Sequence, residues 1–337
     1  HQKDYLAVKG LPALREAVAA WVKRTEGLDY SPANVLVGPG TKELMFLVQL
    51  VYYGDLVIPS PSWVSYAPQA RIIGRHIHWL RTSPRNGLGV EPEALEELCA
   101  RDPNRPRLLI LNTPSNPTGH CYSADQLKAI AEVLRKYRVL ALSDEIYSGT
   151  HYTNEHESLA RYYPEGTIIS NGLSKWCGAG GWRLGFFVFP DSLSWLANGM
   201  AAVASETFTA TSAPIQYAAV DALQDLPEMD EYLQRSRQIL AELAGYSYRQ
   251  LAAAGAELRG DPDAPVSSVA SLEHATEGSL SFLANARYRK HLRGTRATAV
   301  ILQAEYAGEA PGAVLVASNP YAAYARAAGL ISPQPSA

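Results

Sequence analysis

Short runs of apolar residues alternate along this chain with longer stretches in which apolar residues recur at helical spacing. Residues 10–24 have Pro12 near their start and apolar positions at helical intervals, which predicts an amphipathic helix. Further helices are predicted at residues 41–51, 123–137, 192–199, 214–223 and 229–244. Runs typical of buried strands occupy residues 35–37, 56–58, 77–80, 108–111, 139–142, 168–169 and 186–189. This alternation predicts an α/β domain with a mostly parallel sheet flanked by helices.

The pattern changes after Gly245, where small residues dominate and turn-forming residues cluster at 260–265. Apolar runs at 297–302 and 314–317 predict strands of a small α+β module. The expected organisation is a large domain at residues 1–245, a small module at 246–331, and a Pro- and Ser-containing tail at 332–337. A length of 337 residues suits one large domain and one smaller one.

Composition excludes several classes of protein and favours none in particular. The chain is 47% hydrophobic and 19% charged with a net charge of -3, values typical of a globular protein that does not bind nucleic acid. Three widely spaced cysteines predict neither a disulfide framework nor a metal site, and they fit a reducing cytoplasm. No apolar run approaches the roughly 18 residues that span a bilayer, and the first residues do not form a signal peptide.

The strongest chemical signal is the segment Gly172-Leu-Ser-Lys-Trp-Cys-Gly-Ala-Gly-Gly-Trp-Arg-Leu-Gly185. It places Lys175 after a predicted strand and Arg183 after a glycine-rich loop. A lysine amine is a nucleophile and proton carrier whose pKa shifts readily, and a guanidinium makes forked contacts with phosphate. Read alone, a lysine in such a setting is more often a surface residue, so its assignment depends on the other motifs.

Two polar motifs directly follow predicted strands. Asp144 and Tyr147 lie in Ser143-Asp-Glu-Ile-Tyr-Ser148, and Asn116 lies in Asn112-Thr-Pro-Ser-Asn-Pro-Thr-Gly119. Ligands of α/β folds bind at the carboxyl ends of strands, which makes these three side chains candidates for a site. Taken separately, the aspartate is equally well a helix cap beside a buried tyrosine, and the second motif is only a turn.

A strand-glycine-helix junction at Val37-Gly-Pro-Gly-Thr-Lys-Glu-Leu44 predicts an anion site. Gly40 allows close approach of the backbone, and Thr41 and Lys42 stand near a helix start, where free N–H groups and the helix dipole bind phosphate. Trp63, in Pro61-Ser-Trp-Val-Ser-Tyr66, is a candidate for stacking on a ring, with packing in the core or an interface as the alternative.

Taken together, these motifs resemble those of class I and II aminotransferases, which are pyridoxal-phosphate enzymes of fold type I. The resemblance covers about residues 1–245 and implies that Lys175 forms a Schiff base with pyridoxal 5′-phosphate, whose ring acts as an electron sink. It implies that Asp144 pairs with the protonated ring nitrogen, and that Asn116 and Tyr147 contact the ring oxygen.

The same resemblance assigns the rest of the cofactor site. It implies that Arg183 and the backbone amides near Gly40, Thr41 and Lys42 bind the phosphate. Trp63 takes the position of the aromatic residue that stacks on the pyridine ring.

The implied reaction moves an amino group from an amino acid to a 2-oxo acid, with the Lys175 amine carrying the α-proton. Tyr5 matches a tyrosine that reaches the phosphate of the partner subunit in the family, which implies a homodimer. Lyases and decarboxylases share this fold and cofactor, so the class of reaction stays open.

Two family features are not found where they are expected. Almost no N-terminal arm precedes Tyr5, and the usual small domain is not recognisable after Gly245. In the family that domain carries an arginine that clamps the substrate α-carboxylate. Arg249, Arg259, Arg287 and Arg326 lie outside the expected motif. No residue is therefore assigned as the clamp, and turnover without one is an open question.

Residues 246–331 instead resemble the N-terminal uridine-binding domain of UDP-3-O-acylglucosamine N-acyltransferase, an enzyme of lipid A synthesis. The resemblance depends on segments such as Leu280-Ser-Phe-Leu-Ala-Asn-Ala-Arg-Tyr288. It implies that Phe282, Asn285 and Tyr288 hold the uracil of a UDP-sugar. A strand with an ordinary buried aromatic residue is the alternative. Acyl transfer is not expected, because the chain ends before the hexapeptide repeats that carry the catalytic histidine of that enzyme.

Three hypotheses follow from these resemblances. The first is an aminotransferase core that binds its cofactor but is impaired in substrate binding. The second is a UDP-sugar-binding module joined to an inactive scaffold of the pyridoxal-phosphate type. In the third, the two parts were joined during cloning, assembly or gene prediction and do not serve one another.

Overall fold

The computed structural model of this chain describes residues 4–83, 86–152, 156–253, 256–260, 266, 268–321, 323–324 and 327. The chain divides into two compact units, one formed by residues up to 237 without 117–119, the other by 117–119 and the residues from 238 onward. The predicted tail at 332–337 lies outside the described residues. No helix in these described ranges is both long and apolar enough to cross a membrane.

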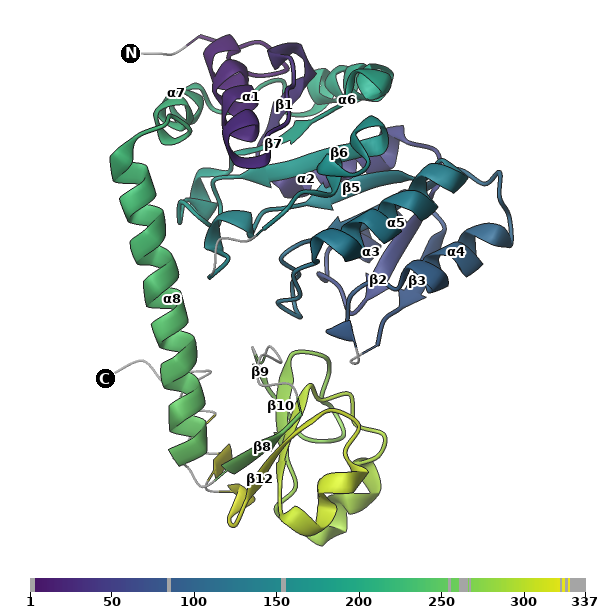
Figure 1. The fold of residues 1–337 in the computed structure, drawn as a ribbon, viewed down its shortest axis with the longest axis vertical. Helices are drawn as coiled ribbons and strands as arrows, with labels where there is room; N and C mark the ends of the chain where they lie inside the picture. Colours follow the sequence, from purple (N-terminus) through teal and green to yellow (C-terminus); the bar gives the residue numbers. More distant parts are fainter. Residues whose placement is uncertain are drawn as a thin grey trace. The chain divides into compact units, whose positions relative to one another are not determined.

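A seven-stranded sheet with strand order β1-β7-β6-β5-β4-β2-β3 forms the centre of the first unit (Figure 1). Strand β7 is antiparallel to β1 and to β6, and the other pairs of this sheet are parallel, which confirms the mostly parallel sheet. Each strand contains or overlaps one of the apolar runs that predicted it. The strands are β1 (Val35–Gly38), β2 (Asp55–Ser60), β3 (Ile77–Arg81), β4 (Arg107–Asn112), β5 (Leu140–Asp144), β6 (Thr167–Gly172) and β7 (Gly185–Val188).

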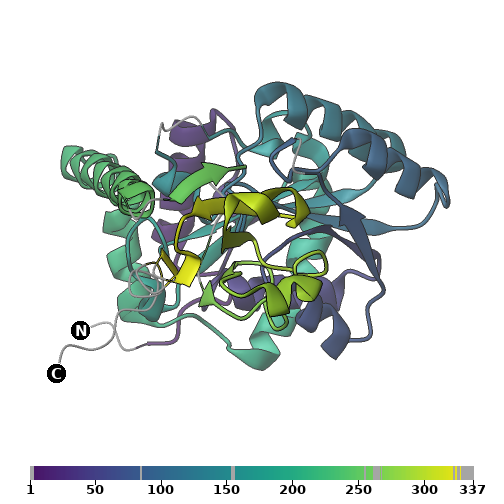
Figure 2. The same ribbon diagram turned by 90° about the horizontal axis from the view of Figure 1, so that it is seen from below.

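Helices cover both faces of this sheet, because successive side chains of a buried strand point to opposite sides. In β1, Leu36 packs into one apolar cluster, whereas Val35 and Val37 belong to a cluster on the opposite face. One face is covered by α2 (Thr41–Val51), α3 (Tyr66–Ile72) and α6 (Ser194–Thr207). The other is covered by α1 (Pro12–Glu26), α4 (Pro92–Ala100), α5 (Ala124–Tyr137) and α7 (Ala213–Ala222). Helices α4 and α5 lie side by side in both views (Figure 1, Figure 2).

Local sequence signals explain where the helices begin and end. Ser123 and Gln126 form a capping box at the start of α5, each side chain accepting a hydrogen bond from the other residue's backbone N–H. Helix α1 has Pro12 in its first turn and is capped at its C-terminus by Gly27, which adopts the left-handed conformation with a φ of 71°. The apolar pattern did not predict α3 and α4, because helices of 7 and 9 residues contain too few apolar positions to show a period.

The described part of the second unit contains a five-stranded sheet with strand order β8-β12-β11-β10-β9. Strands β11 and β12 confirm the two predicted strands of this region, and β8 is antiparallel to β12. The strands are β8 (Ala256–Arg259), β9 (Ser268–Val269), β10 (Ser279–Phe282), β11 (Ala299–Leu302) and β12 (Ala313–Ala317). Helix α8 (Pro227–Ala253) contributes residues to both units, and it contains the predicted boundary at residue 245.

Candidate active site

The polar residues that follow the central strands lie together at one edge of the sheet. Asn112 ends β4 and is paired with Asp144, which ends β5. Asp144 is in turn paired with Ser170 of β6. Because these strands are parallel, their carboxyl ends meet at the same edge, which is where α/β folds place ligand sites.

Asp144 is a buried carboxylate with an incomplete set of hydrogen bonds. Its side chain is 3% exposed, and Tyr66 donates a hydrogen bond from its hydroxyl to Oδ2 over 2.5 Å. The other oxygen, Oδ1, has a long contact of 3.5 Å with the Ser170 hydroxyl. Burial raises the pKa of Asp144 to about 6, although the hydrogen bonds from Tyr66, from the backbone of Ile146 and from Ser170 act in the opposite direction. The carboxylate therefore retains acceptor capacity for a cationic partner.

Two buried asparagines fix the backbone around this carboxylate. Asn112 donates from its side-chain amide to the Asp144 carbonyl over 2.8 Å and accepts from the Asn116 N–H over 2.6 Å. Asn171 donates to the Glu145 carbonyl over 2.9 Å and to the Ser148 hydroxyl over 3.1 Å. The motif residues are thus held by side chains that the sequence interpretation did not assign. The available signal was an asparagine within an otherwise apolar strand, because a buried amide needs partners.

The structure brings Asn116, Tyr147 and Lys175 together. The Asn116 side-chain amide donates to the Tyr147 hydroxyl over 3.1 Å. The Lys175 Nζ lies 5.1 Å from the centroid of the Tyr147 ring. Lys175 follows β6 and is exposed, whereas Asn116 and Tyr147 are partly buried. A primary amine, an amide and a phenol therefore lie beside the edge that carries Asp144.

The residues predicted to bind a phosphate lie at the first turn of α2 and at Arg183. Gly40 has a φ of 89° and precedes the N-terminus of α2, where the first N–H groups have no partner within the helix. A Cβ atom on Gly40 would lie 2.2 Å from the Arg183 guanidinium, and one on Gly185 would lie 2.4 Å from the Thr41 nitrogen. The glycines therefore permit close packing that brings the Arg183 side chain to the start of α2.

Trp63 and Lys42 lie close to each other. The Lys42 Nζ is 5.4 Å from the centroid of the Trp63 ring. The same indole ring makes an edge-to-face contact with Tyr66 at 5.3 Å, and Tyr66 contacts Asp144. Tyr66 is a further residue of the site that sequence reasoning missed. It lies in the segment that supplied Trp63, but only the fold shows that its hydroxyl reaches β5.

None of the contacts described above involves the remaining predicted residues. Tyr5 is 92% exposed. In the second unit, Phe282 stacks on Tyr324 with 4.1 Å between ring centroids, and the Asn285 side chain accepts from the Arg287 N–H. Tyr288 is exposed. The role of these three residues in uridine binding stays a prediction.

We expect the Tyr66→Phe variant to lose about 1.5–3 kcal/mol of unfolding free energy at pH 8, because it removes a hydrogen bond to a buried charge. The loss at pH 4 should be smaller. The pKa of Asp144 is raised above 3.8, so the stability that Asp144 contributes is complete below that value and declines as pH rises through about 6. Loss of this hydrogen bond should raise the pKa of Asp144 further, so the unfolding free energy should fall by more between pH 4 and pH 8. Urea unfolding at the two pH values measures it.

Tyr122→Phe is the matched control for this experiment. The Tyr122 hydroxyl is also buried, but it accepts from the neutral Val90 N–H over 2.9 Å. Its removal should cost about the same at both pH values, since neither partner titrates in this range. Equal losses at pH 4 and pH 8 in Tyr66→Phe would show that Asp144 is not charged in the folded protein.

Comparisons with known proteins agree with this architecture. The family model described as Aminotransferase class I and II matches residues 2–303. The chain is 36% identical to an aspartate aminotransferase of Geobacillus stearothermophilus over 239 residues, which are 69% of this chain and 59% of the relative. It is 33% identical to an aspartate/prephenate aminotransferase of Thermus thermophilus over 249 residues, which are 73% of this chain and 61% of the relative.

A solved structure supports the same assignment. The aspartate aminotransferase from Thermus thermophilus with maleate matches with a TM-score of 0.70 and 31% identity, covering 76% of this chain and 66% of that one. The fold is that of the type I pyridoxal-phosphate transferases. The chain belongs to the class I and II aminotransferase family, whose members use pyridoxal 5′-phosphate.

The matches cover only part of the relatives and do not extend over all of this chain. The chain spans about three fifths of the length of the curated relatives, 59% and 61% for the two described above. The family model continues past residue 245 to residue 303. None of these matches supports the resemblance of residues 246–331 to a uridine-binding domain, and that resemblance stays a prediction.

Proposed function

We propose that this chain is an aminotransferase whose residues 1–245 form a pyridoxal-phosphate-binding core, and that it moves an amino group between an amino acid and a 2-oxo acid. The observation that carries the proposal is the arrangement at the carboxyl edge of β4, β5 and β6. There a buried carboxylate, an amide–phenol pair and a lysine amine come from three separate motifs. No single motif specifies such an arrangement.

The residues present fit the cofactor at both of its ends. Asp144 retains acceptor capacity on Oδ1, which suits a protonated ring nitrogen. At the other end, the free N–H groups of α2 and the Arg183 guanidinium form a cradle in which two glycines leave no room for a Cβ atom. Backbone N–H groups at a helix start and an arginine together favour a phosphate. When bound, the cofactor supplies an electron-withdrawing ring conjugated with the reacting carbon.

Each residue of the site then has a defined task. The Lys175 amine would anchor the cofactor and, when freed, would take and return the α-proton of the substrate. Asp144 keeps a negative charge beside the ring nitrogen in a setting from which water is excluded. Asn116 and Tyr147, which already share a hydrogen bond, would contact the ring oxygen with an amide donor and a phenol. The Trp63 indole would stack on one face of the ring when the cofactor is bound.

Substrates and assembly are inferred from relatives. Aspartate is the first amino donor to test, because the relatives described above are named for aspartate transamination. We assign no arginine to the substrate α-carboxylate. The exposed Tyr5 is consistent with a homodimer in which it reaches the phosphate of the partner subunit.

The proposal is tested by adding pyridoxal 5′-phosphate to the full chain. We expect a visible absorption band, and borohydride should convert it to a stable label on the peptide that contains Lys175. Aspartate should then abolish the band in the unreduced protein, a 2-oxo acid should restore it, and oxaloacetate should accumulate. A chain that stays colourless contradicts the proposal, and release of carbon dioxide or ammonia instead of 2-oxo acid identifies a decarboxylase or lyase.

A further inference from the structure

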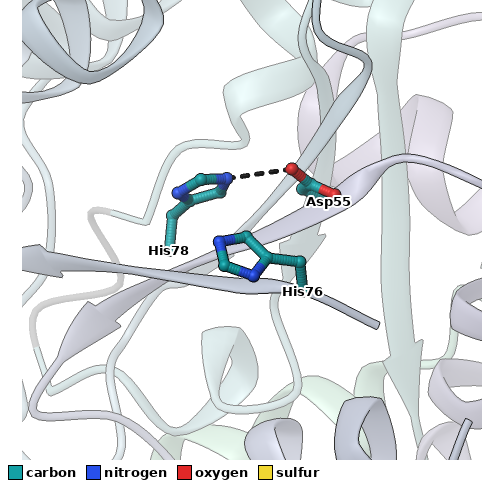
Figure 3. Close-up of side chains that lie close together, drawn as sticks. All are labelled: Asp55, His76 and His78. Carbon is teal, nitrogen blue, oxygen red and sulfur yellow. Dashed lines mark hydrogen bonds and ion pairs between the residues drawn. The ribbon is translucent and has the colours of Figure 1, made fainter. Parts of the chain in front are cut away.

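Two histidines and an aspartate lie together on neighbouring strands far along the sheet from the candidate active site. Asp55 is the first residue of β2, His76 directly precedes β3, and His78 lies within β3 (Figure 3). Strand β3 is the edge strand and is parallel to β2, with Val57 paired with His78. Alternate residues of a strand share a face, so Asp55 and Val57 of β2 lie on the same face of the sheet as their neighbours His76 and His78. Asp55 is at the amino end of its strand, so the cluster lies at the opposite edge from Asp144.

The three side chains approach one another closely. The His78 Nε2 lies 3.0 Å from the Asp55 Oδ2, and the His76 and His78 rings meet edge to face with 4.5 Å between centroids. One nitrogen or oxygen atom from each residue lies within 4.8 Å of the others. Figure 3 shows both imidazole rings beside the carboxylate. They line an open pocket of about 590 Å³.

The three residues differ in exposure, so the carboxylate is fixed in place while the His76 ring can move toward an ion. The Asp55 side chain is 8% exposed and is held in place, whereas the His78 side chain is 28% exposed and His76 is exposed. Ligand atoms around Zn²⁺ stand about 2.0–2.2 Å from the metal, which requires a modest inward movement of the rings. The exposed His76 ring can make this movement by rotating, without disturbing the core. Three protein ligands would leave a coordination position open to the pocket.

A guanidinium competes for the same carboxylate. Arg105 donates from Nε to Asp55 Oδ2 over 2.8 Å and from Nη2 to Oδ1 over 3.0 Å. These bonds and that of His78 hold the pKa of Asp55 below its ordinary value despite burial. The Arg105 side chain is 51% exposed, so it can turn toward solvent when an ion takes its place. A cation and Arg105 therefore exclude one another at Asp55.

We propose that Asp55, His76 and His78 form a binding site for a divalent transition-metal ion such as Zn²⁺, and that the ion fastens edge strand β3 to β2. Imidazole and carboxylate ligands suit Zn²⁺, Co²⁺ and Ni²⁺ better than Mg²⁺ or Ca²⁺, which prefer oxygen alone. Sequence analysis predicted no metal site, because two histidines separated by one residue meet the aspartate only through the pairing of β2 with β3.

The second group of possible ligands among the described residues is less suitable. Glu26, Glu145 and His156 are close enough to share an ion, but their side chains are buried. Ser158 already donates to both glutamates, from its N–H to Glu26 and from its hydroxyl to Glu145. His156 forms an ion pair with Glu145 at 3.4 Å. This group is occupied by its own contacts and has no open side.

The test is a calorimetric titration of the full chain with ZnCl2, repeated on three variants. His76→Ala removes an exposed ligand and should weaken binding by about 10-fold or more, since even residues behind a metal ligand cost 10–100-fold. His274→Ala, an exposed histidine of the second unit, should bind as the unaltered chain does. Arg105→Gln should bind Zn²⁺ more tightly, because it removes the competing cation. Circular dichroism confirms that each variant is folded.

A second readout identifies the ligands and excludes the cysteines. Co²⁺ bound to the unaltered chain should show the visible bands of nitrogen and oxygen ligation, and these bands should be lost in His76→Ala. Zn²⁺ should also raise the melting temperature of the unaltered chain and not that of His76→Ala. Absence of binding, equal Zn²⁺ affinity in His76→Ala, or a thiolate-to-cobalt absorption band would each overturn the proposal.

Discussion

The Lys175→Ala variant should lose covalent attachment of the cofactor and show at least about a 10,000-fold lower rate of amino-group transfer. Proton transfer by a positioned side chain alone contributes about 100- to 10,000-fold, and the lysine also anchors the cofactor. The structure places the Lys175 Nζ 5.1 Å from the Tyr147 ring, beside the edge that carries Asp144. The measurements are borohydride labelling followed by peptide mapping, and single-turnover kinetics with aspartate.

Lys42→Ala is the matched control, because Lys42 is a second exposed lysine of the same predicted site. Its expected contribution to the phosphate cradle comes from the backbone, so this variant should keep the visible band and the borohydride label. A borohydride label that persists in Lys175→Ala, or that disappears in Lys42→Ala, would show that Lys175 is not the lysine that anchors the cofactor.

The sequence contained enough to locate the site, because each motif follows an apolar run. Asp144 and Asn112 are the last residues of strands whose buried cores are continuous apolar segments. Once the runs are interpreted as parallel strands, the carboxyl ends must share one edge. The convergence of Asn116, Tyr147 and Lys175 was therefore predictable in outline. Its distances were not, because they depend on how loops of different lengths return to the edge.

Contacts between segments remote in sequence were beyond the reach of pattern analysis. Tyr66 reaches Asp144 because α3 packs against the face of the sheet that includes β5, and α3 is too short to show a helical period. The pairing of β2 with β3 likewise determines which residue faces His78. Such contacts follow from strand order, and alternating apolar runs do not specify the order of strands.

The Asp144→Asn variant should separate the activity of the site from its stability. Asparagine has the shape of aspartate but no charge, and loss of one fixed electrostatic group in an enclosed site lowers kcat by roughly 100- to 1,000-fold. Asp144 is placed to supply that charge, because its own hydrogen bonds are with the hydroxyl groups of Tyr66 and Ser170 and with a backbone N–H, none of which neutralises it. The rate of transfer at saturating cofactor measures this loss.

Without the cofactor, the Asp144→Asn variant should be more stable than the unaltered chain at high pH, although it is less active. Burial raises the pKa of Asp144 from 3.8 to about 6, so ionisation of this group costs the folded state free energy as pH rises through that range. Asparagine does not ionise, so relative to the unaltered chain the variant should gain up to about 3 kcal/mol between pH 4 and pH 8. Urea unfolding at both values measures the difference. A variant that keeps full activity would show that the negative charge of Asp144 is not needed for catalysis. A variant that loses stability equally at both pH values would show that ionisation of Asp144 does not destabilise the fold.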